Sequence, residues 1–175
     1  SSLALAYAQK YNKNVLSMIL RGIFLCSREE VEWFLYKMKI IFPDYWDNFV
    51  SILNNKEKKD ILKAYYSRLI NPDPKIHLAA AIAWARYEAN CSTLLPNASK
   101  SIKFRDTKMA LSLSRIEAHY FLNNLFLEKD QILKNIHKIK HIPGFIIQGR
   151  YDVICPPENA FMLHKKWENS QLKIV

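Results

Sequence analysis

The pattern of apolar and polar residues predicts two kinds of structure along this chain. Near its start, the segment "SLALAYAQKY" is small or apolar on nearly every side, which predicts a helix over residues 3–12 that is buried on more than one side. The near-continuous apolar run "VLSMILRG" predicts a strand over residues 15–22 that is covered on both faces. Near the other end, "GFIIQGRYD" predicts a strand, "PPENAFMLHKKWE" a helix and "LKIV" the start of another strand.

Between these two parts, from Ser27 to Leu127, the apolar residues recur at helical spacing. The segment "SREEVEWFLYKM" begins with Ser27, a candidate N-cap, and predicts one helix. Three more helices are predicted in "NKEKKDILKAYYSRLI", "PKIHLAAAIAWARYEANCSTL" and "DTKMALSLSRIEAHYFLNN", followed by a short connection in "QILKNIHKIKHIP". This order of elements predicts an α/β fold with a helical insertion. No strand precedes the first helix, so we expect an incomplete α/β core.

Composition and charge narrow the class of protein. Half of the 175 residues are hydrophobic, which is typical of a globular domain, and no apolar run reaches the length that crosses a bilayer. No signal peptide is recognisable, so we expect a soluble protein of the cytoplasm without a membrane partner. The formal net charge is +10, but the lysines are scattered and the densest group, "NNKEKKD", is interleaved with acids. We therefore expect a solvated basic surface and no nucleic-acid partner.

The residue types that commonly form metal and phosphate sites occur here without the spacing that such sites need. Only three glycines occur, too far apart for a phosphate-binding loop. The five histidines show no metal-ligand spacing, and the three cysteines, Cys26, Cys91 and Cys155, favour free thiols over disulfides or a metal site. We expect neither a metal nor another cofactor.

An isolated acid, Asp152, follows the predicted strand "GFIIQ" directly after a tight turn at Gly149. Reactive groups in open parallel sheets lie at the carboxyl ends of strands, and α/β hydrolases carry their catalytic acid in such a position. A strand-end Asp is also a common turn or helix-capping residue. The position alone leaves both interpretations open.

Six segments taken together resemble one known family. "SSLALAYAQKY", "LRGIF", "IFPDYW", "AAAIAWARYEANCSTLLP", "RIEAHYF" and "IPGFIIQGRYDVICPP" are similar to the proline iminopeptidases (prolyl aminopeptidases) of the α/β-hydrolase superfamily. The resemblance implies a hydrolase core with a helical cap: residues 1–26 as core, 27–130 as cap and 131–175 as core again. It also implies a serine exopeptidase that releases N-terminal proline from peptides and needs no metal or cofactor.

The resemblance also implies roles for single residues. Asp152 matches the catalytic acid, whereas the family's serine and histidine have no counterpart in these 175 residues. The chain is thus expected to be a C-terminal portion of such an enzyme and inactive alone. Glu88 and Glu117 match the acids that bind the charged amino terminus of the substrate. The apolar pocket around the proline ring is matched by Phe24, Phe34, Phe121 and Cys155.

Two departures and two alternatives accompany the resemblance. Phe34 stands where relatives can carry a tyrosine, and Ala118 replaces an asparagine that is common after the second glutamate. Without the resemblance, Glu88 and Glu117 are ordinary helix-surface acids. The alternatives are an α/β hydrolase that acts on another small amide or ester, and a decayed, non-catalytic product.

Overall fold

The computed structural model describes residues 1–95 and 106–175, and these form two compact units. The first unit contains Ser1–Glu30 and Leu127–Val175, and the second contains Val31–Phe126. The predicted division after residues 26 and 130 assigns a hydrolase core and a cap, and that assignment stays a prediction. Within the described residues, no helix is long and apolar enough to span a membrane.

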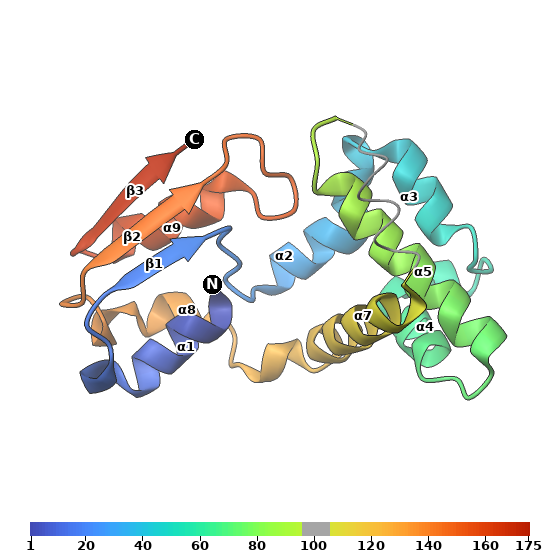
Figure 1. Ribbon diagram of the computed structural model, residues 1–175, viewed down its shortest axis with the longest axis horizontal. Helices are drawn as coiled ribbons and strands as arrows, with labels where there is room; N and C mark the ends of the chain where they lie inside the picture. Colours follow the sequence, from blue (N-terminus) through green and yellow to red (C-terminus); the bar gives the residue numbers. More distant parts are fainter. Residues whose placement is uncertain (96–105) are drawn as a thin grey trace. The chain divides into compact units, whose positions relative to one another are not determined.

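The first unit is built on a parallel sheet of three strands, which confirms the predicted α/β class (Figure 1). The strands are β1 (Met18–Arg21), β2 (Gly144–Gln148) and β3 (Ser170–Ile174), in the order β1-β2-β3. Met18 pairs with Gly144, and Gly144 with Ser170. The helix α9 (Pro157–Lys166) connects β2 to β3. A parallel pair of strands needs such a crossover connection.

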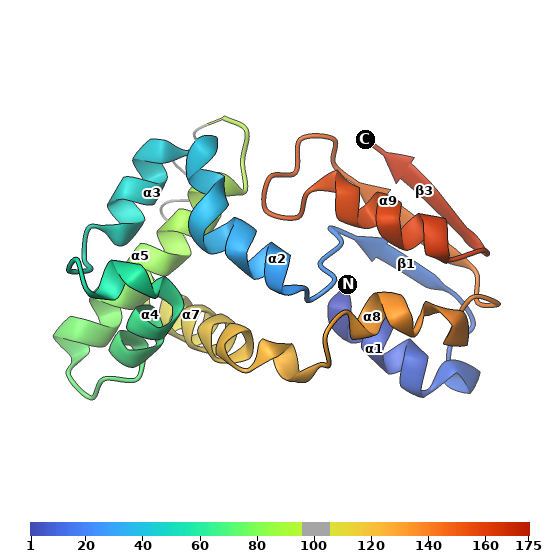
Figure 2. The same cartoon turned by 180° about the vertical axis from the view of Figure 1, so that it is seen from behind.

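One face of this sheet carries the core of the unit. Its alternate residues pack with side chains from α9, from α1 (Ser2–Lys10) and from α8 (Gln131–Lys134), and α9 is seen in front of the strands in Figure 2. Short 3₁₀ turns, η1 (Asn12–Asn14) and η6 (Ile136–Lys138), follow α1 and α8. The buried cluster consists of Leu5, Ala8, Met18, Leu20, Ile23, Leu25, Ile132, Ile136, Ile139, Ile142, Ile146, Ala160, Leu163 and Trp167.

Two predictions about this unit are wrong in the described residues. The strand was expected to be covered on both faces, but Ile19 is 75% exposed because α1, α8 and α9 pack against the opposite face. The first helix was expected to be buried on several sides, but its buried residues are Leu5, Ala8 and Gln9, and Leu3 is exposed. The strand is also shorter than expected, because pairing with β2 begins only at Met18.

A close approach inside the core involves a glycine. A Cβ atom added at Gly144 would lie 2.5, 2.6 and 2.9 Å from three ring atoms of Trp167. The indole of Trp167 is buried and donates its Nε1–H to the carbonyl of Ile142 at 2.9 Å. The absence of a side chain at Gly144 therefore lets the indole lie against β2.

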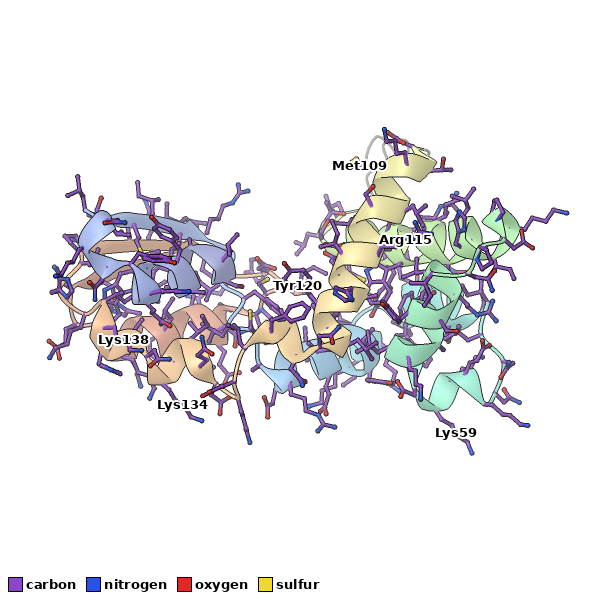
Figure 3. The ribbon with its side chains drawn as sticks, turned by 90° about the horizontal axis from the view of Figure 1, so that it is seen from below. Lys59, Met109, Arg115, Tyr120, Lys134 and Lys138 are labelled. Atoms are coloured by element: carbon purple, nitrogen blue, oxygen red, sulfur yellow. The ribbon has the colours of Figure 1, made fainter. Side chains whose placement is uncertain are left out.

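The second unit is helical, as predicted. Helix α2 (Arg28–Glu32) crosses the boundary from the first unit. The elements that follow are η2 (Trp33–Lys37), η3 (Met38–Ile40), α3 (Pro43–Val50), η4 (Glu57–Lys59), α4 (Ile61–Leu69), α5 (Pro74–Cys91), α7 (Thr107–Leu122) and η5 (Asn124–Phe126). Helix α5 packs against α3, α4 and α7. Figure 3 labels Met109, Arg115 and Tyr120 along α7.

Three details of this unit differ from the prediction. The expected helix in "SREEVEWFLYKM" changes after Glu32 into a π-helical turn, η2, and then into the 3₁₀ turn η3. The expected second helix is interrupted at Asp60, whose carboxylate accepts from Lys63 N and caps α4. Helix α3, which was not predicted, begins with Pro43 at its first position.

Candidate functional site

Two acids predicted to bind substrate lie on neighbouring helices of the second unit, Glu88 on α5 and Glu117 on α7. Each helix begins at an aspartate, Asp73 or Asp106, whose side chain accepts from the first backbone N–H groups. The hydroxyl of Ser114 donates to the carbonyl of Ala81 at 3.2 Å and fixes α7 against α5. The two carboxyl groups are thereby held within hydrogen-bonding reach of each other.

The surroundings of the acidic pair are asymmetric. The indole Nε1–H of Trp84 donates to Glu117 Oε2 at 2.8 Å. Glu88 Oε2 is shielded from solvent and has no hydrogen-bond partner among the described residues. Burial, and next the negative charge of Glu117, raise the pKa of Glu88 to about 8. Burial also raises the pKa of Glu117, while hydrogen bonds from Trp84 and Glu88 oppose that rise.

Aromatic rings adjoin this acidic pair. Trp84, which holds Glu117, lies with its ring centroid 5.5 Å from that of Phe34 and 6.2 Å from that of Phe121. Phe34 and Phe121 are themselves 6.1 Å apart, edge to face. Phe34 lies in the π-helical turn η2, and π-helical turns are frequent at functional sites. The arrangement combines negative charge with apolar rings, which suits a cation that carries a hydrocarbon ring.

The predicted catalytic acid lies in the first unit, in the turn that follows β2. Asp152 Oδ1 accepts from the backbone N–H of Cys155 at 2.9 Å, and Oδ2 accepts from Gln148 Nε2 at 3.1 Å. Gln148 Nε2 also donates to the carbonyl of Cys155 at 2.8 Å. Both oxygens of Asp152 thus have a donor that fixes the plane of the carboxylate, and each oxygen retains a further lone pair for another donor.

Gln148 also connects this turn to the loop that carries Phe24. Its Oε1 accepts from the backbone N–H of Ile23 at 2.9 Å. Phe24 N donates to the hydroxyl of Ser1 at 3.0 Å, and Phe24 O accepts from the hydroxyl of Ser2 at 2.6 Å. The start of α1 therefore fixes the backbone of Phe24 at the carboxyl end of β1.

The seven predicted site residues thus form two groups, one in each unit. The structure brings Glu88, Glu117, Phe34 and Phe121 together in the second unit. It brings Asp152 and Cys155 together in the first unit, where Gln148 connects them to the segment before Phe24. Cys26 and Cys91 have free thiols, as predicted. Within the described residues, no group of His, Cys, Asp and Glu side chains is arranged to hold a metal ion.

Sequence reasoning missed two residues that hold the predicted acids. Trp84 lies four residues before Glu88 on the same helix face, a spacing that could have drawn attention to it. Gln148 continues the inward-facing alternation of Gly144 and Ile146, so a fully buried amide was foreseeable at that position. A buried amide needs hydrogen-bond partners, and the turn that contains Asp152 supplies them.

Comparison with known proteins shows which proteins have a similar sequence. The chain is 44% identical over 177 residues to a protein of Leptolyngbya boryana named "Probable proline iminopeptidase", a match that covers 100% of this chain and 55% of that protein. It is 42% identical to a protein named "Proline iminopeptidase" from Xylella fastidiosa and to another from Arabidopsis thaliana, with 100% of this chain and 56% and 47% of those proteins covered. The chain is a relative of the proline iminopeptidases. No family model matches it.

The relationship to the proline iminopeptidases extends over the whole chain but not over the whole of those proteins. The chain spans about half the length of the curated relatives that it matches. Because the match covers the whole of this chain, it includes the positions of both groups of site residues, Asp152 with Cys155 and Glu88 with Glu117.

Proposed function

We propose that this chain is the substrate-binding part of a serine exopeptidase that releases N-terminal proline from peptides. In this proposal the first unit is part of an α/β-hydrolase core, and residues 27–130 form a helical cap. The observation that carries the proposal is the acidic pair, Glu88 and Glu117, beside the rings of Phe34 and Phe121. The similarity to proline iminopeptidases supports the same substrate class. The free thiols of Cys26 and Cys91 support a cytoplasmic setting.

The proposed chemistry assigns a role to each group. An N-terminal proline is a secondary ammonium, and Glu88 and Glu117 accept its N–H groups in charge-assisted hydrogen bonds. A proline inside a peptide chain carries no such charge, so the pair restricts cleavage to the amino terminus. Phe34 and Phe121 pack against the pyrrolidine ring. Asp152 accepts from a histidine Nδ1–H and stabilises the imidazolium that forms when this histidine takes a serine's proton.

The test uses a chimaera in which this chain replaces the matching half of the Leptolyngbya relative. We expect Glu88→Gln and Glu117→Gln each to lower kcat/KM on a prolyl amide by about ten- to a hundredfold, because each removes one charge-assisted bond to the ammonium. Hydrolysis of a small uncharged ester changes much less. Phe121→Ala lowers the preference for proline over alanine because the ring loses a packing partner.

Glu29→Gln is the matched control, because Glu29 is an exposed acid on α2. It should leave both activities unchanged. If both site variants kept the wild-type ratio of prolyl to ester hydrolysis, the exopeptidase assignment would be wrong. An active chimaera that favours the ester would instead identify a hydrolase of another small amide or ester.

A further inference from the structure

The contact between the two carboxyl groups of the acidic pair requires a proton. Glu88 and Glu117 lie within hydrogen-bonding reach of each other. An ionised carboxylate only accepts hydrogen bonds, so two ionised groups have nothing to donate to one another. A hydrogen bond within the pair therefore means that one of the two groups is protonated, and the pair carries a single negative charge.

Trp84 decides which group carries that charge. An indole N–H only donates, so the 2.8 Å contact makes Glu117 Oε2 an acceptor. Trp84 is fully buried between the rings of Phe34, Phe49 and Tyr65, which fixes the direction of this donor. Glu88 Oε2 receives no comparable bond among the described residues. The bond from Trp84 favours the ionised form of Glu117 and leaves the proton on Glu88.

Five other ionisable side chains on the packed elements interact with groups away from the pair. The hydroxyl of Tyr65 on α4 donates to Phe49 O, and that of Tyr87 on α5 donates to Phe34 O. Arg115 on α7 donates to Leu69 O, and Arg68 on α4 pairs with Glu57. Asp44 on α3 acts on the thiol of Cys91. Among the described residues, Glu117 is the charged neighbour that acts on Glu88.

We propose that Trp84 keeps the negative charge of the pair on Glu117 and a proton on Glu88, so that an ammonium ligand releases one proton as it binds. The ligand part of this inference rests on the proposed function. The O–H bond of Glu88 breaks, the proton passes to solvent, and an N–H of the ligand donates to the carboxylate that remains. The pair then carries two negative charges opposite the ligand. Its affinity for the ammonium rises with pH until Glu88 is ionised in the free protein.

The proton is located first, without any ligand, in the 175-residue chain. Glutamate carboxyl carbons are labelled with ¹³C, and their NMR signals are followed from pH 3 to 10. A signal that disappears in Glu88→Gln or in Glu117→Gln is assigned to the residue that was replaced. At pH 7 we expect an acid signal from Glu88 and a carboxylate signal from Glu117. Trp84→Phe keeps the aromatic bulk and removes the donor, so the titration of Glu117 should move upward by about one pH unit.

Trp46→Phe is the matched control, because Trp46 Nε1 donates to a backbone carbonyl, that of Leu35, at 2.9 Å. It should leave both titrations in place. Two carboxylate signals at pH 7, or an equal effect of both tryptophan variants, would overturn the role of Trp84. If Trp84→Phe does not fold, Glu117→Gln still tests the pair. The measured pKa of Glu88 must be lower in that variant, because the negative neighbour of Glu88 has been removed.

The ligand step is measured by calorimetry with prolinamide at pH 6.5 in buffers of different ionisation enthalpy. We expect about one proton to be released per prolinamide bound, and none in Glu88→Gln. N-acetylprolinamide, which has no ammonium, should not bind. Binding of prolinamide without proton release would overturn this inference and leave the proposed function intact. Failure of prolinamide to bind would overturn the proposed function and the ligand step together, while the titration still decides where the proton lies.

Discussion

Glu30 joins three separate parts of the first unit through one buried carboxylate. It accepts from the backbone N–H groups of Leu25, at 2.9 and 3.1 Å, and of Ser27, at 2.8 Å. Asn159 Nδ2 on α9 donates to it at 2.6 Å. In return, Glu30 N donates to the Ser27 hydroxyl, which makes a reciprocal cap at the start of α2. Cys26 lies between Leu25 and Ser27 and has a φ of 64°. The hydrogen bonds to Glu30 on either side of it help to hold this backbone conformation.

We predict that Glu30→Ala lowers the free energy of unfolding by about 3 kcal/mol, because it leaves two buried donors and one partly buried donor without an acceptor. Urea denaturation followed by circular dichroism measures the loss. Glu29→Ala is the control, since Glu29 lies beside Glu30 on α2 and is exposed. Equal losses in the two variants would contradict a special role for the buried carboxylate.

Part of this group of hydrogen bonds around Glu30 was predictable from sequence. The spacing of Ser27 and Glu30 predicts the cap, and the structure confirms Ser27 as its first residue. Asn159 was not predictable, because it lies 129 residues away and is brought there only by the packing of α9. The hydrogen bond from Trp84 to Glu117 could not be predicted for the same reason, since α5 and α7 come into contact only in the folded unit.

At the scale of elements, the side chain of Gln148 at the end of β2 forms hydrogen bonds to two different loops, and we call this arrangement the Gln148 junction. One side chain connects the loop after β1, at Ile23, to the turn at Asp152 and Cys155. The strand itself is predictable from its apolar run. The junction is not, because it depends on which loops lie beside the strand end.

We predict that Gln148→Leu keeps the volume of the side chain and loses the junction. The amide of Ile23 then has no acceptor, and we expect its hydrogen exchange to become about tenfold faster or more, as measured by NMR. Gln171→Leu is the control, because Gln171 lies on β3 with its side chain exposed on the other face. Unchanged exchange at Ile23 would show that Gln148 does not hold the loop.

The helical elements show a second limit of sequence reasoning. Periodicity predicts α5 and α7 well, because both have long apolar stripes and an aspartate at the N-cap. The π-helical turn η2 could not be predicted, since the residues Trp33–Lys37 fit a regular α-helix equally well. That turn carries Phe34, so the least regular part of the helical unit contributes to the candidate site.

At the scale of the whole molecule, the outer face of the sheet is apolar and exposed. Ile19 on β1 and its partner Phe145 on β2 are 75% and 42% exposed, and Ile147 is 37% exposed. The sequence predicted a strand that is covered on both faces, and the exposure of Ile19 shows that only one face is covered among the described residues. It could not indicate that α1, α8 and α9 pack against one face only.

We predict that the 175-residue chain self-associates as its concentration rises, through this outer face. The double variant Ile19→Thr and Phe145→Thr retains strand propensity and should reduce the association, as measured by light scattering over a range of concentrations. Leu16→Thr is the control, because Leu16 is 91% exposed but precedes β1. An equal reduction in both variants would assign the association to general hydrophobicity rather than to the sheet.

The contact between Gly144 and Trp167 has a consequence for how this sequence can change over generations. Any residue other than glycine at 144 would collide with the indole, so no single substitution there is neutral while the tryptophan remains. Replacing Trp167 first by a smaller residue leaves a void and removes the donor from Ile142 O. Every route to a different pair therefore passes through a less stable intermediate. Gly144 and Trp167 should be inherited together, as a single unit of selection.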